Sequence, residues 1–459
     1  MSRLVISAAH KSSGKTTVTL GLLAALSKRG LRLQPFKKGP DYIDPLWHKA
    51  ASGQPCWNLD FYSMSLPEML ALAARESESA DLSLIEGNKG LFDGMDTDGS
   101  DDTAALAKLL KAPVVLVIDC RGTTRGIAPL LKGYLDFDQD LDIGGVILNQ
   151  VAGPRHEGKL KAAIARYLPG LPILGAIPRD RELEVTERHL GLVPANEQTD
   201  ASEMISMLSA SVEKHVDLDQ LLAVAKRAQD LPKPAALPAK PKPDLRIAIA
   251  RDSAFGFYYP DDLLAFEQNG AELVPFDTMR DSHLPKTIDG LFIGGGFPET
   301  HLRSLSANHV LRSEIKAALK AGLPCHAECG GLMYLAQSIR YQGQQADMVG
   351  FIKAKVAMQE RPVGRGYVRL IDSGKGPWTA ISENGQSFAA HEFHHSHLED
   401  LKGPQTYAFK VERGVGIQDG HDGLVIGNTV ACYAHLRSLA GTPWVARFLD
   451  FVRSVRARG

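Results

Sequence analysis

Apolar residues in the first half of the chain follow two different spacings. Short, mostly apolar runs occupy 4–9, 82–85, 114–118 and 143–148, while Leu20, Leu23 and Leu26 recur at helical spacing. The short runs predict buried strands, and the helical spacing predicts a helix with one apolar face. Strands that alternate with helices in this way predict a parallel, doubly wound α/β sheet, which binds its ligand at the carboxyl ends of the strands.

A proline-rich break separates this half from a second one. Residues 231–243 carry five prolines and no core pattern, which predicts a semi-extended spacer. Beyond it, 246–250 and 290–293 resemble strands again, and 263–268 resembles part of a helix. A chain of 459 residues is too long for one core. We therefore expect a domain over 1–230, a linker over 231–244 and a second α/β domain over 245–459.

Composition and charge narrow the class of protein. The 52 Lys and Arg residues balance 53 Asp and Glu residues, so charge gives no reason to expect nucleic acid or a membrane surface as a partner. The five cysteines are odd in number and lack metal-type pairing, which is typical of a reducing cytosol. No apolar run approaches the roughly 18 residues of a membrane span, and no signal peptide is evident. We expect a cytoplasmic protein.

A phosphate-binding loop is predicted after the first strand. Residues 10–17 read His-Lys-Ser-Ser-Gly-Lys-Thr-Thr, and a strand, a small-residue loop with Gly-Lys-Thr and a helix follow each other as in a P-loop. Backbone N–H groups would hold the phosphates of ATP, Lys15 would neutralise the β and γ oxygens, and Thr16 would give its hydroxyl to Mg²⁺. Asn149 ends another strand, where its amide could read a purine edge. The expected ATP site comprises Ser12, Ser13, Gly14, Lys15, Thr16, Thr17 and Asn149.

Acidic residues occur at two further positions of interest in the first half of the chain. Asp41 and Asp44 lie in a Gly- and Pro-rich segment, and Glu86 follows a buried strand and precedes a glycine, which is the Walker-B position. Carboxylates in a loop are also common as solvated turn residues. Beside a P-loop, we expect Thr16, Asp41, Asp44 and Glu86 to bind Mg²⁺ or to orient the substrate.

Cys329 is the candidate nucleophile of the second half. It stands between a strand-like and a helix-like run, as the nucleophile does in a nucleophile elbow, and the N–H groups of the helix start favour a thiolate. The alternative is a buried structural cysteine. We expect the glycine loop at 294–296, through Gly295 and Gly296, and Gly330 after the thiol to form an oxyanion hole. His435 at the end of a later strand is the candidate base.

Two other segments carry chemistry that competes with this interpretation. Residues 391–395 read His-Glu-Phe-His-His and match the H-E-x-x-H zinc-protease pattern, which requires a helix. Because 386–396 lacks helical periodicity, we expect a strand or loop and no zinc protease. The segment 177–192 is either an exposed turn with a helix start or a contact to substrate or nucleotide.

The motifs around Cys329, the Gly-Gly-Gly-Phe-Pro-Glu loop and Tyr-Ala-His435 resemble a class I glutamine amidotransferase domain. Residues 10–17, the Lys-Gly-Pro-Asp-Tyr-Ile-Asp-Pro segment at 38–45, Glu86-Gly and Gly-Leu-Phe-Asp-Gly at 90–94 resemble the amidoligase half of the cobyrinic acid a,c-diamide synthase family. The resemblance implies a dethiobiotin-synthetase-like P-loop sheet followed by a flavodoxin-like domain. It also implies that glutamine supplies ammonia at Cys329 and that ATP activates a peripheral carboxylate of a tetrapyrrole.

The resemblance implies roles for individual residues as well. Cys329 is then the nucleophile and His435 its base, and Tyr42, Ile43 and Asp93 lie near the tetrapyrrole. Many such glutaminases carry a Glu two residues after the histidine, but Arg437 stands there, so the third member of the triad is unidentified. Sirohaem is an alternative acceptor, and a regulatory P-loop ATPase with a non-catalytic glutaminase-like module is a more remote one. A homodimer is left open.

Overall fold

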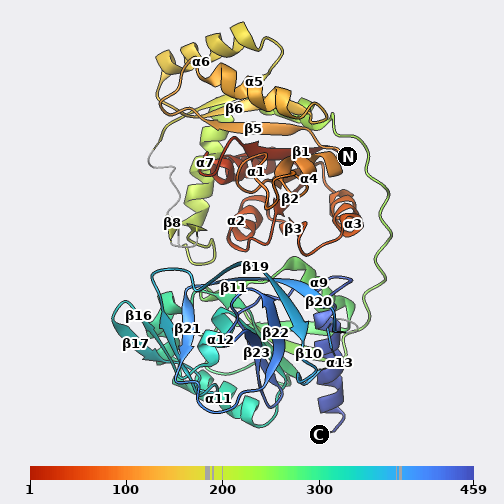
Figure 1. The fold of residues 1–459 in the computed structure, drawn as a ribbon, viewed down its shortest axis with the longest axis vertical. Helices are drawn as coiled ribbons and strands as arrows, with labels where there is room; N and C mark the ends of the chain where they lie inside the picture. The colour runs from red at the N-terminus through yellow and green to blue at the C-terminus, as the bar shows by residue number, and fades with distance from the viewer. Residues whose placement is uncertain (181–186, 189–190, 199, 379, 382–384, 459) are drawn as a thin grey trace. The chain divides into compact units, whose positions relative to one another are not determined.

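The chain divides into two compact units in the computed structural model (Figure 1). The structure describes residues 1–180, 187–188, 191–198, 200–378, 380–381 and 385–458, so 181–186 and 189–190 of the segment 177–192 lie outside the described residues. Unit 1 is Met1–Ala236 and unit 2 is Leu237–Gly459. The division falls within the proline-rich spacer, which has no helix or strand. No helix in the described ranges has both the length and the apolar character needed to cross a membrane.

Unit 1 is built on a sheet with strand order β3-β2-β4-β1-β5-β6-β7, in which every neighbouring pair is parallel. The strands are β1 (Arg3–Ala8), β2 (Leu33–Lys38), β3 (Trp57–Leu59), β4 (Leu82–Glu86), β5 (Val114–Asp119), β6 (Ile143–Val151) and β7 (Ile173–Pro178). The doubly wound sheet is therefore confirmed. Because β1 pairs with β4 and β4 with β2, the segments that follow these strands meet at one edge of the sheet.

Helices and one short hairpin complete unit 1. The helices are α1 (Lys15–Lys28), α2 (Ile43–Ser52), α3 (Leu66–Ser77), α4 (Thr103–Leu109), α5 (Ile127–Phe137), α6 (Pro154–Tyr167), α7 (Ala201–His215) and α8 (Leu218–Ala225), and β8 (Glu187–Arg188) pairs with β9 (Gly191–Leu192). Helix α1, which carries the end of the P-loop, packs against α7 (Figure 1). A side chain at Gly21 would meet Val212 Cγ2 at 2.5 Å, so the glycine permits this close approach.

Unit 2 contains a mixed sheet in the order β12-β10-β13-β15-β24-β23-β22-β19-β20. The strands are β10 (Leu245–Ala250), β12 (Ala271–Phe276), β13 (Gly290–Ile293), β15 (Cys325–Glu328), β19 (Gly364–Asp372), β20 (Ser387–His394), β22 (Tyr407–Arg413), β23 (His421–Ile426) and β24 (Thr429–Cys432). The first five in this order are parallel and follow the flavodoxin-like sequence 2-1-3-4-5, which confirms the expected fold of unit 2.

Smaller elements flank this sheet. They are β11 (Phe255–Phe257) with β14 (Gly295–Gly296), the sheet of β16 (Ser338–Tyr341), β17 (Gln344–Asp347), β18 (Lys355–Met358) and β21 (Ser396–Glu399), the 3₁₀ turn Pro298–His301, and the helices α9 (Pro260–Gln268), α10 (Leu302–Ala307), α11 (His309–Lys320), α12 (Gly330–Leu335) and α13 (Trp444–Arg456). The main sheet is apolar on both faces, as β10 illustrates. Ile247 and Ile249 belong to the core under α13, whereas Ala248 and Ala250 belong to the core under α11.

Candidate functional sites

The P-loop of unit 1 is clamped against the end of β6. Gly14, the N-cap residue of α1, has a φ of 88°, and a Cβ atom on it would lie 2.2 Å from the side-chain amide nitrogen of Asn149. That amide donates a hydrogen bond of 3.0 Å to the carbonyl of Ser13, and Ser13 Oγ donates to the carbonyl of His10 at 2.8 Å. Ser12 also has a left-handed φ, of 64°. The loop is thus held in a fixed conformation before any ligand binds.

Asp44, Glu86 and Thr16 lie together beside a lysine that the sequence analysis did not assign. Lys37, at the end of β2, places its Nζ 2.6 Å from Asp44 Oδ2 and 2.7 Å from Glu86 Oε1, and only 4 % of its side chain is exposed. Thr16 donates its hydroxyl to Glu86 Oε1 at 2.7 Å. On the far side, His48 Nε2 lies 2.6 Å from Glu86 Oε2. The parallel pairing of β2 with β4 brings Lys37 and Glu86 together.

Burial and neighbouring charges shift the pKa values of the acids in opposite directions. Burial by itself raises the pKa of Glu86, but Lys37 and His48 outweigh it and hold that pKa below its usual range. Burial and the neighbouring Asp44 raise the pKa of Asp41 to about 7. Asp41 Oδ1 accepts hydrogen bonds from the backbone N–H groups of Ile43 and Asp44, which leaves its second oxygen for other contacts. Carboxylate and hydroxyl oxygens are the donors that Mg²⁺ prefers, so the donor chemistry of Thr16, Asp44 and Glu86 fits that ion.

The remaining residues predicted for unit 1 lie near the same edge. Lys15 donates to the carbonyl of Lys89, and burial lowers its pKa to about 8. Asp93 accepts from the N–H of Gly90 at 3.1 Å and so closes its own loop. Tyr42 precedes α2 and is half-buried, whereas Ile43 is 9 % exposed, so little of Ile43 is available to a substrate. Their contacts with substrate stay predictions.

A small cavity of about 60 Å³ lies beside the P-loop, between α1, α7 and the ends of β6 and β7. Thr17, Asn149, Ile177, Pro178 and Val212 are among the residues that line it. Two residues of the expected ATP site, Thr17 and Asn149, therefore border this cavity. The described part of segment 177–192 therefore contributes to its wall.

Cys329 occupies a strained turn between β15 and α12, as the nucleophile-elbow pattern predicts. Its φ is 47° and its ψ is −102°, values that a residue with a side chain rarely adopts. Its N–H donates to the carbonyl of Cys432 at 2.7 Å, and its Sγ lies 3.8 Å from the carbonyl of Phe393. The N–H of Gly330 at the start of α12 lowers the pKa of the Cys329 thiol, as expected, but other effects outweigh it. Burial, followed by Glu299, raises the pKa of the Cys329 thiol, so a base is needed.

The three glycines predicted for the oxyanion hole come together beside this thiol. A Cβ atom on Gly330 would lie 2.9 Å from the carbonyl oxygen and 3.0 Å from the nitrogen of Gly296. A Cβ atom on Gly295 would lie 2.4 Å from Cε1 of His435. The loop, the start of α12 and the predicted base therefore share one small space, which only glycine at these positions leaves open.

His435 is fixed from two sides. Its backbone forms an antiparallel bridge to His391 of β20, with the N–H of His435 donating at 2.7 Å. The two preceding N–H groups, of Tyr433 and Ala434, donate to the buried carboxylate of Asp422 at 3.0 and 2.9 Å. Burial raises the pKa of Asp422 to about 6. The strand end that carries the predicted base is thus anchored from two directions.

Comparison with known proteins identifies both halves. Residues 5–193 match the CobQ/CobB/MinD/ParA nucleotide binding domain, and residues 246–442 match the CobB/CobQ-like glutamine amidotransferase domain. A protein of Magnetococcus marinus described as cobyrinate a,c-diamide synthase is 46 % identical over 100 % of this chain and 98 % of its own length. Proteins with the same description from Listeria innocua and Methanosarcina acetivorans are 41 % and 40 % identical, each over 95 % of this chain and over 96 % and 93 % of their own lengths. The chain belongs to the cobyrinate a,c-diamide synthase family.

Membership of this family confirms the resemblance seen in the sequence and the class of reaction. The chain is a glutamine-hydrolysing carbon–nitrogen ligase that pairs a nucleotide-binding domain, which uses ATP, with a glutamine amidotransferase domain. Residues 391–394 of the His-Glu-Phe-His-His segment lie on strand β20 and His395 follows it, so the zinc-protease pattern lacks the helix it needs. Glu392 of this segment accepts from the N–H groups of Val415 and Gly416 and holds a loop.

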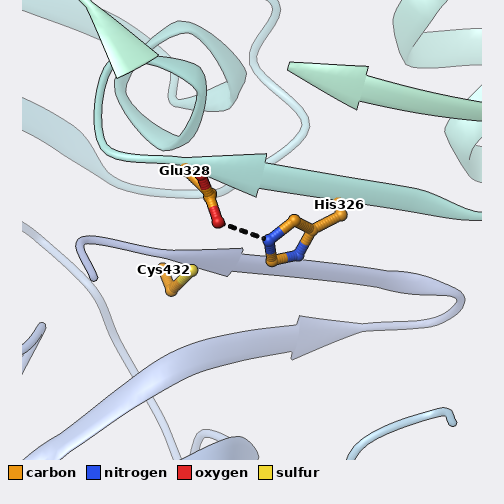
Figure 2. A group of neighbouring side chains, drawn as sticks. All are labelled: His326, Glu328 and Cys432. Atoms are coloured by element: carbon orange, nitrogen blue, oxygen red, sulfur yellow. Dashed lines mark hydrogen bonds and ion pairs between the residues drawn. The ribbon is translucent and has the colours of Figure 1, made fainter. Parts of the chain in front are cut away.

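One residue of the glutaminase site escaped the sequence analysis. Glu328, directly before Cys329, lies with His326 and Cys432 in a buried group (Figure 2), in which one carboxylate oxygen, one ring nitrogen and the sulfur lie within 4.8 Å of one another. Glu328 Oε1 is 3.0 Å from His326 Nε2, and Glu328 Oε2 is 3.6 Å from His435 Nδ1. The signal in the sequence that could have pointed to Glu328 was an acidic residue at the end of a strand-like run, directly before the predicted nucleophile. Arg437, which stands where many class I glutaminases carry a Glu, forms an ion pair of 2.8 Å with Asp261.

Proposed function

We propose that the enzyme uses ATP and glutamine to convert peripheral carboxylates of cobyrinic acid into amides, as a cobyrinate a,c-diamide synthase. One observation carries the proposal: full-length relatives at up to 46 % identity have this description, and this chain keeps both the P-loop with its acids and the cysteine elbow with its histidine. A regulatory ATPase with a non-catalytic module has no need for the strained Cys329 and the anchored His435.

In the glutaminase half, Cys329 and His435 release ammonia. The thiol proton passes to His435 as sulfur bonds to the amide carbon of glutamine, and Gly295, Gly296 and Gly330 line the space for the oxyanion. His435 returns that proton to the amide nitrogen as the carbon–nitrogen bond breaks and ammonia leaves. Water then hydrolyses the thioester to give glutamate.

In the amidoligase half, the acceptor carboxylate attacks the γ-phosphorus of ATP and ADP leaves, after which ammonia attacks the acyl carbon and phosphate leaves. Ser12 to Thr17 and Asn149 form the nucleotide site, and Lys15 neutralises phosphate charge as it develops. Thr16, Asp41, Asp44 and Glu86 would hold Mg²⁺, which when bound offsets the charge of the phosphates. Lys37 keeps Asp44 and Glu86 in position.

The choice of acceptor rests on the descriptions of the relatives from Magnetococcus marinus, Listeria innocua and Methanosarcina acetivorans, which name cobyrinate and not sirohaem. Tyr42, Ile43 and Asp93 stay the predicted contacts to the macrocycle. A cytoplasmic location and a homodimer also stay predictions.

The test is to incubate the purified enzyme with ATP, Mg²⁺ and glutamine in parallel with cobyrinic acid, hydrogenobyrinic acid and sirohaem. Each conversion exchanges a hydroxyl for an amino group, so mass spectrometry reports both the product and the number of amides. We expect a diamide from cobyrinic acid. Conversion of sirohaem alone would replace the acceptor, and no product with any macrocycle would refute the proposal.

A further inference from the structure

The carboxylate of Glu328 reaches the base of the glutaminase site from an unusual position in the chain. Glu328 ends β15 and is followed directly by Cys329, so nucleophile and carboxylate are neighbours in sequence. Its side chain is buried, 2 % exposed, and Oε2 lies 3.6 Å from Nδ1 of His435. Its other oxygen accepts a hydrogen bond of 2.9 Å from the N–H of Leu436, the residue after His435. The carboxylate therefore contacts both the ring and the backbone of the base.

We propose that Glu328 is the third member of the glutaminase triad, a positioning residue that orients His435 and stabilises its imidazolium form. This inference rests on the proposed roles of Cys329 and His435. During acylation His435 holds the proton of the Cys329 thiol, and an adjacent carboxylate favours that charge without itself taking the proton. Nδ1 of His435 faces Glu328, so Nε2 is the ring nitrogen left for proton exchange with the thiol.

Glu328 has the charge that this role requires. Burial would raise its pKa, but the neighbouring His326 and His435 outweigh burial and hold the pKa at about 2. Arg437, at the position where many class I glutaminases carry the carboxylate, forms a buried ion pair with Asp261 and packs over Tyr259. In this chain the carboxylate stands directly before the nucleophile. The position two residues after the histidine carries Arg437, which serves an ion pair and a packing contact instead.

His326 fixes the carboxylate in turn. Its Nε2 lies 3.0 Å from Glu328 Oε1, and its Nδ1 has no hydrogen-bond partner among the described residues. The ring packs against Phe292 and Trp444, so a proton on Nδ1 would be a buried donor without an acceptor. The proton therefore sits on Nε2 and is donated to Glu328. Cys432 completes the group seen in Figure 2, but its Sγ donates to the carbonyl of Ala434 at 3.0 Å.

The test compares Glu328→Gln and Glu328→Asp with the wild type and with Glu392→Gln, which alters another buried carboxylate of unit 2. Hydrolysis of glutamine is measured as kcat and KM, and amidation with ammonium chloride reports an intact second activity. We expect Glu328→Gln to lower kcat for glutamine by on the order of 10²–10⁴-fold while KM and ammonia-dependent amidation stay within about threefold. The kcat of Glu328→Asp should lie between those of the wild type and Glu328→Gln, and the kcat of Glu392→Gln should match that of the wild type.

Wild-type kcat in Glu328→Gln would overturn the proposal. Should that variant not fold, Glu328→Asp decides, because wild-type kcat with a shortened side chain also contradicts a positioning role. A stoichiometric metal ion in the purified protein, bound by His326, Glu328 and Cys432, would overturn it too, since the carboxylate would then serve the ion. Cys329→Ala is measured alongside to separate this inference from the proposed function. If Cys329→Ala still hydrolyses glutamine, the proposed function fails. If Cys329→Ala is inactive while Glu328→Gln keeps wild-type activity, only the role of Glu328 is refuted.

Discussion

Lys37→Met removes the cation that lies between two carboxylates of unit 1. The side chain keeps a similar length but loses the ammonium that contacts Asp44 at 2.6 Å and Glu86 at 2.7 Å. The partners are 15 % and 0 % exposed, so both are left as poorly solvated charges, and such a loss costs about 3–5 kcal/mol. For a unit the size of Met1–Ala236, this corresponds to a fall in Tm of roughly 6–20 °C.

The assay is thermal unfolding of the intact chain, in which the transition of unit 1 is the one that ADP shifts. Magnesium ions should raise the Tm of Lys37→Met more than that of the wild type, because the ion can replace the missing positive charge. Lys28→Met is the matched control, since its ion pair with Glu213 is 3.2 Å long but 68 % of the lysine side chain is exposed. It should cost less than about 1 kcal/mol. A Tm of Lys37→Met equal to that of the control would refute the reasoning.

Three further predictions concern the two sites. Lys15→Ala and Glu86→Gln should spare basal glutamine hydrolysis but stop amidation with glutamine or ammonia, because phosphoryl transfer needs charge neutralisation; retained ammonia-dependent synthesis would remove the P-loop from the mechanism. Gly295→Ala should slow glutamine hydrolysis at least about tenfold, because the new methyl group would lie 2.4 Å from Cε1 of His435, while ammonia-dependent synthesis serves as the control. The raised pKa of Asp422, about 6, means that its contribution to stability is present below about pH 4 and lost as pH rises through 6, by at most about 3 kcal/mol. In urea titrations, the free energy of unfolding of Asp422→Asn should therefore fall less than that of the wild type between pH 4 and pH 6. An equal fall would contradict the raised pKa of Asp422.

Local patterns predicted the catalytic elements of both units. The order of strand, Gly-Lys-Thr and helix located Lys15 and Thr16, and the glycines after Cys329 predicted the sharp turn with a φ of 47°. These features depend on residues adjacent in sequence, and backbone sterics dictate them directly. The strained turn at the predicted nucleophile is the clearest example, because its signature is complete within a few residues.

Contacts between distant strands could not be predicted in this way. The role of Lys37 depends on β2 pairing with β4, a sheet order that no spacing in the sequence specifies. Glu328 stood beside the nucleophile, yet its function depends on the return of the chain through β24 to His435. The raised pKa of Cys329 likewise follows from burial within the fold and then from the charge of Glu299, which together outweigh the favourable helix start.

The most direct test of the division of labour between the two units is the nitrogen source that Cys329→Ala can use. If the thiol produces the ammonia and the P-loop site forms the amide, the variant should make no amide with glutamine. It should keep wild-type amidation of cobyrinic acid when ammonium chloride is supplied, with ATP and Mg²⁺ present in both reactions. Loss of both activities in a folded variant, or amidation that continues with glutamine, would contradict this division of labour.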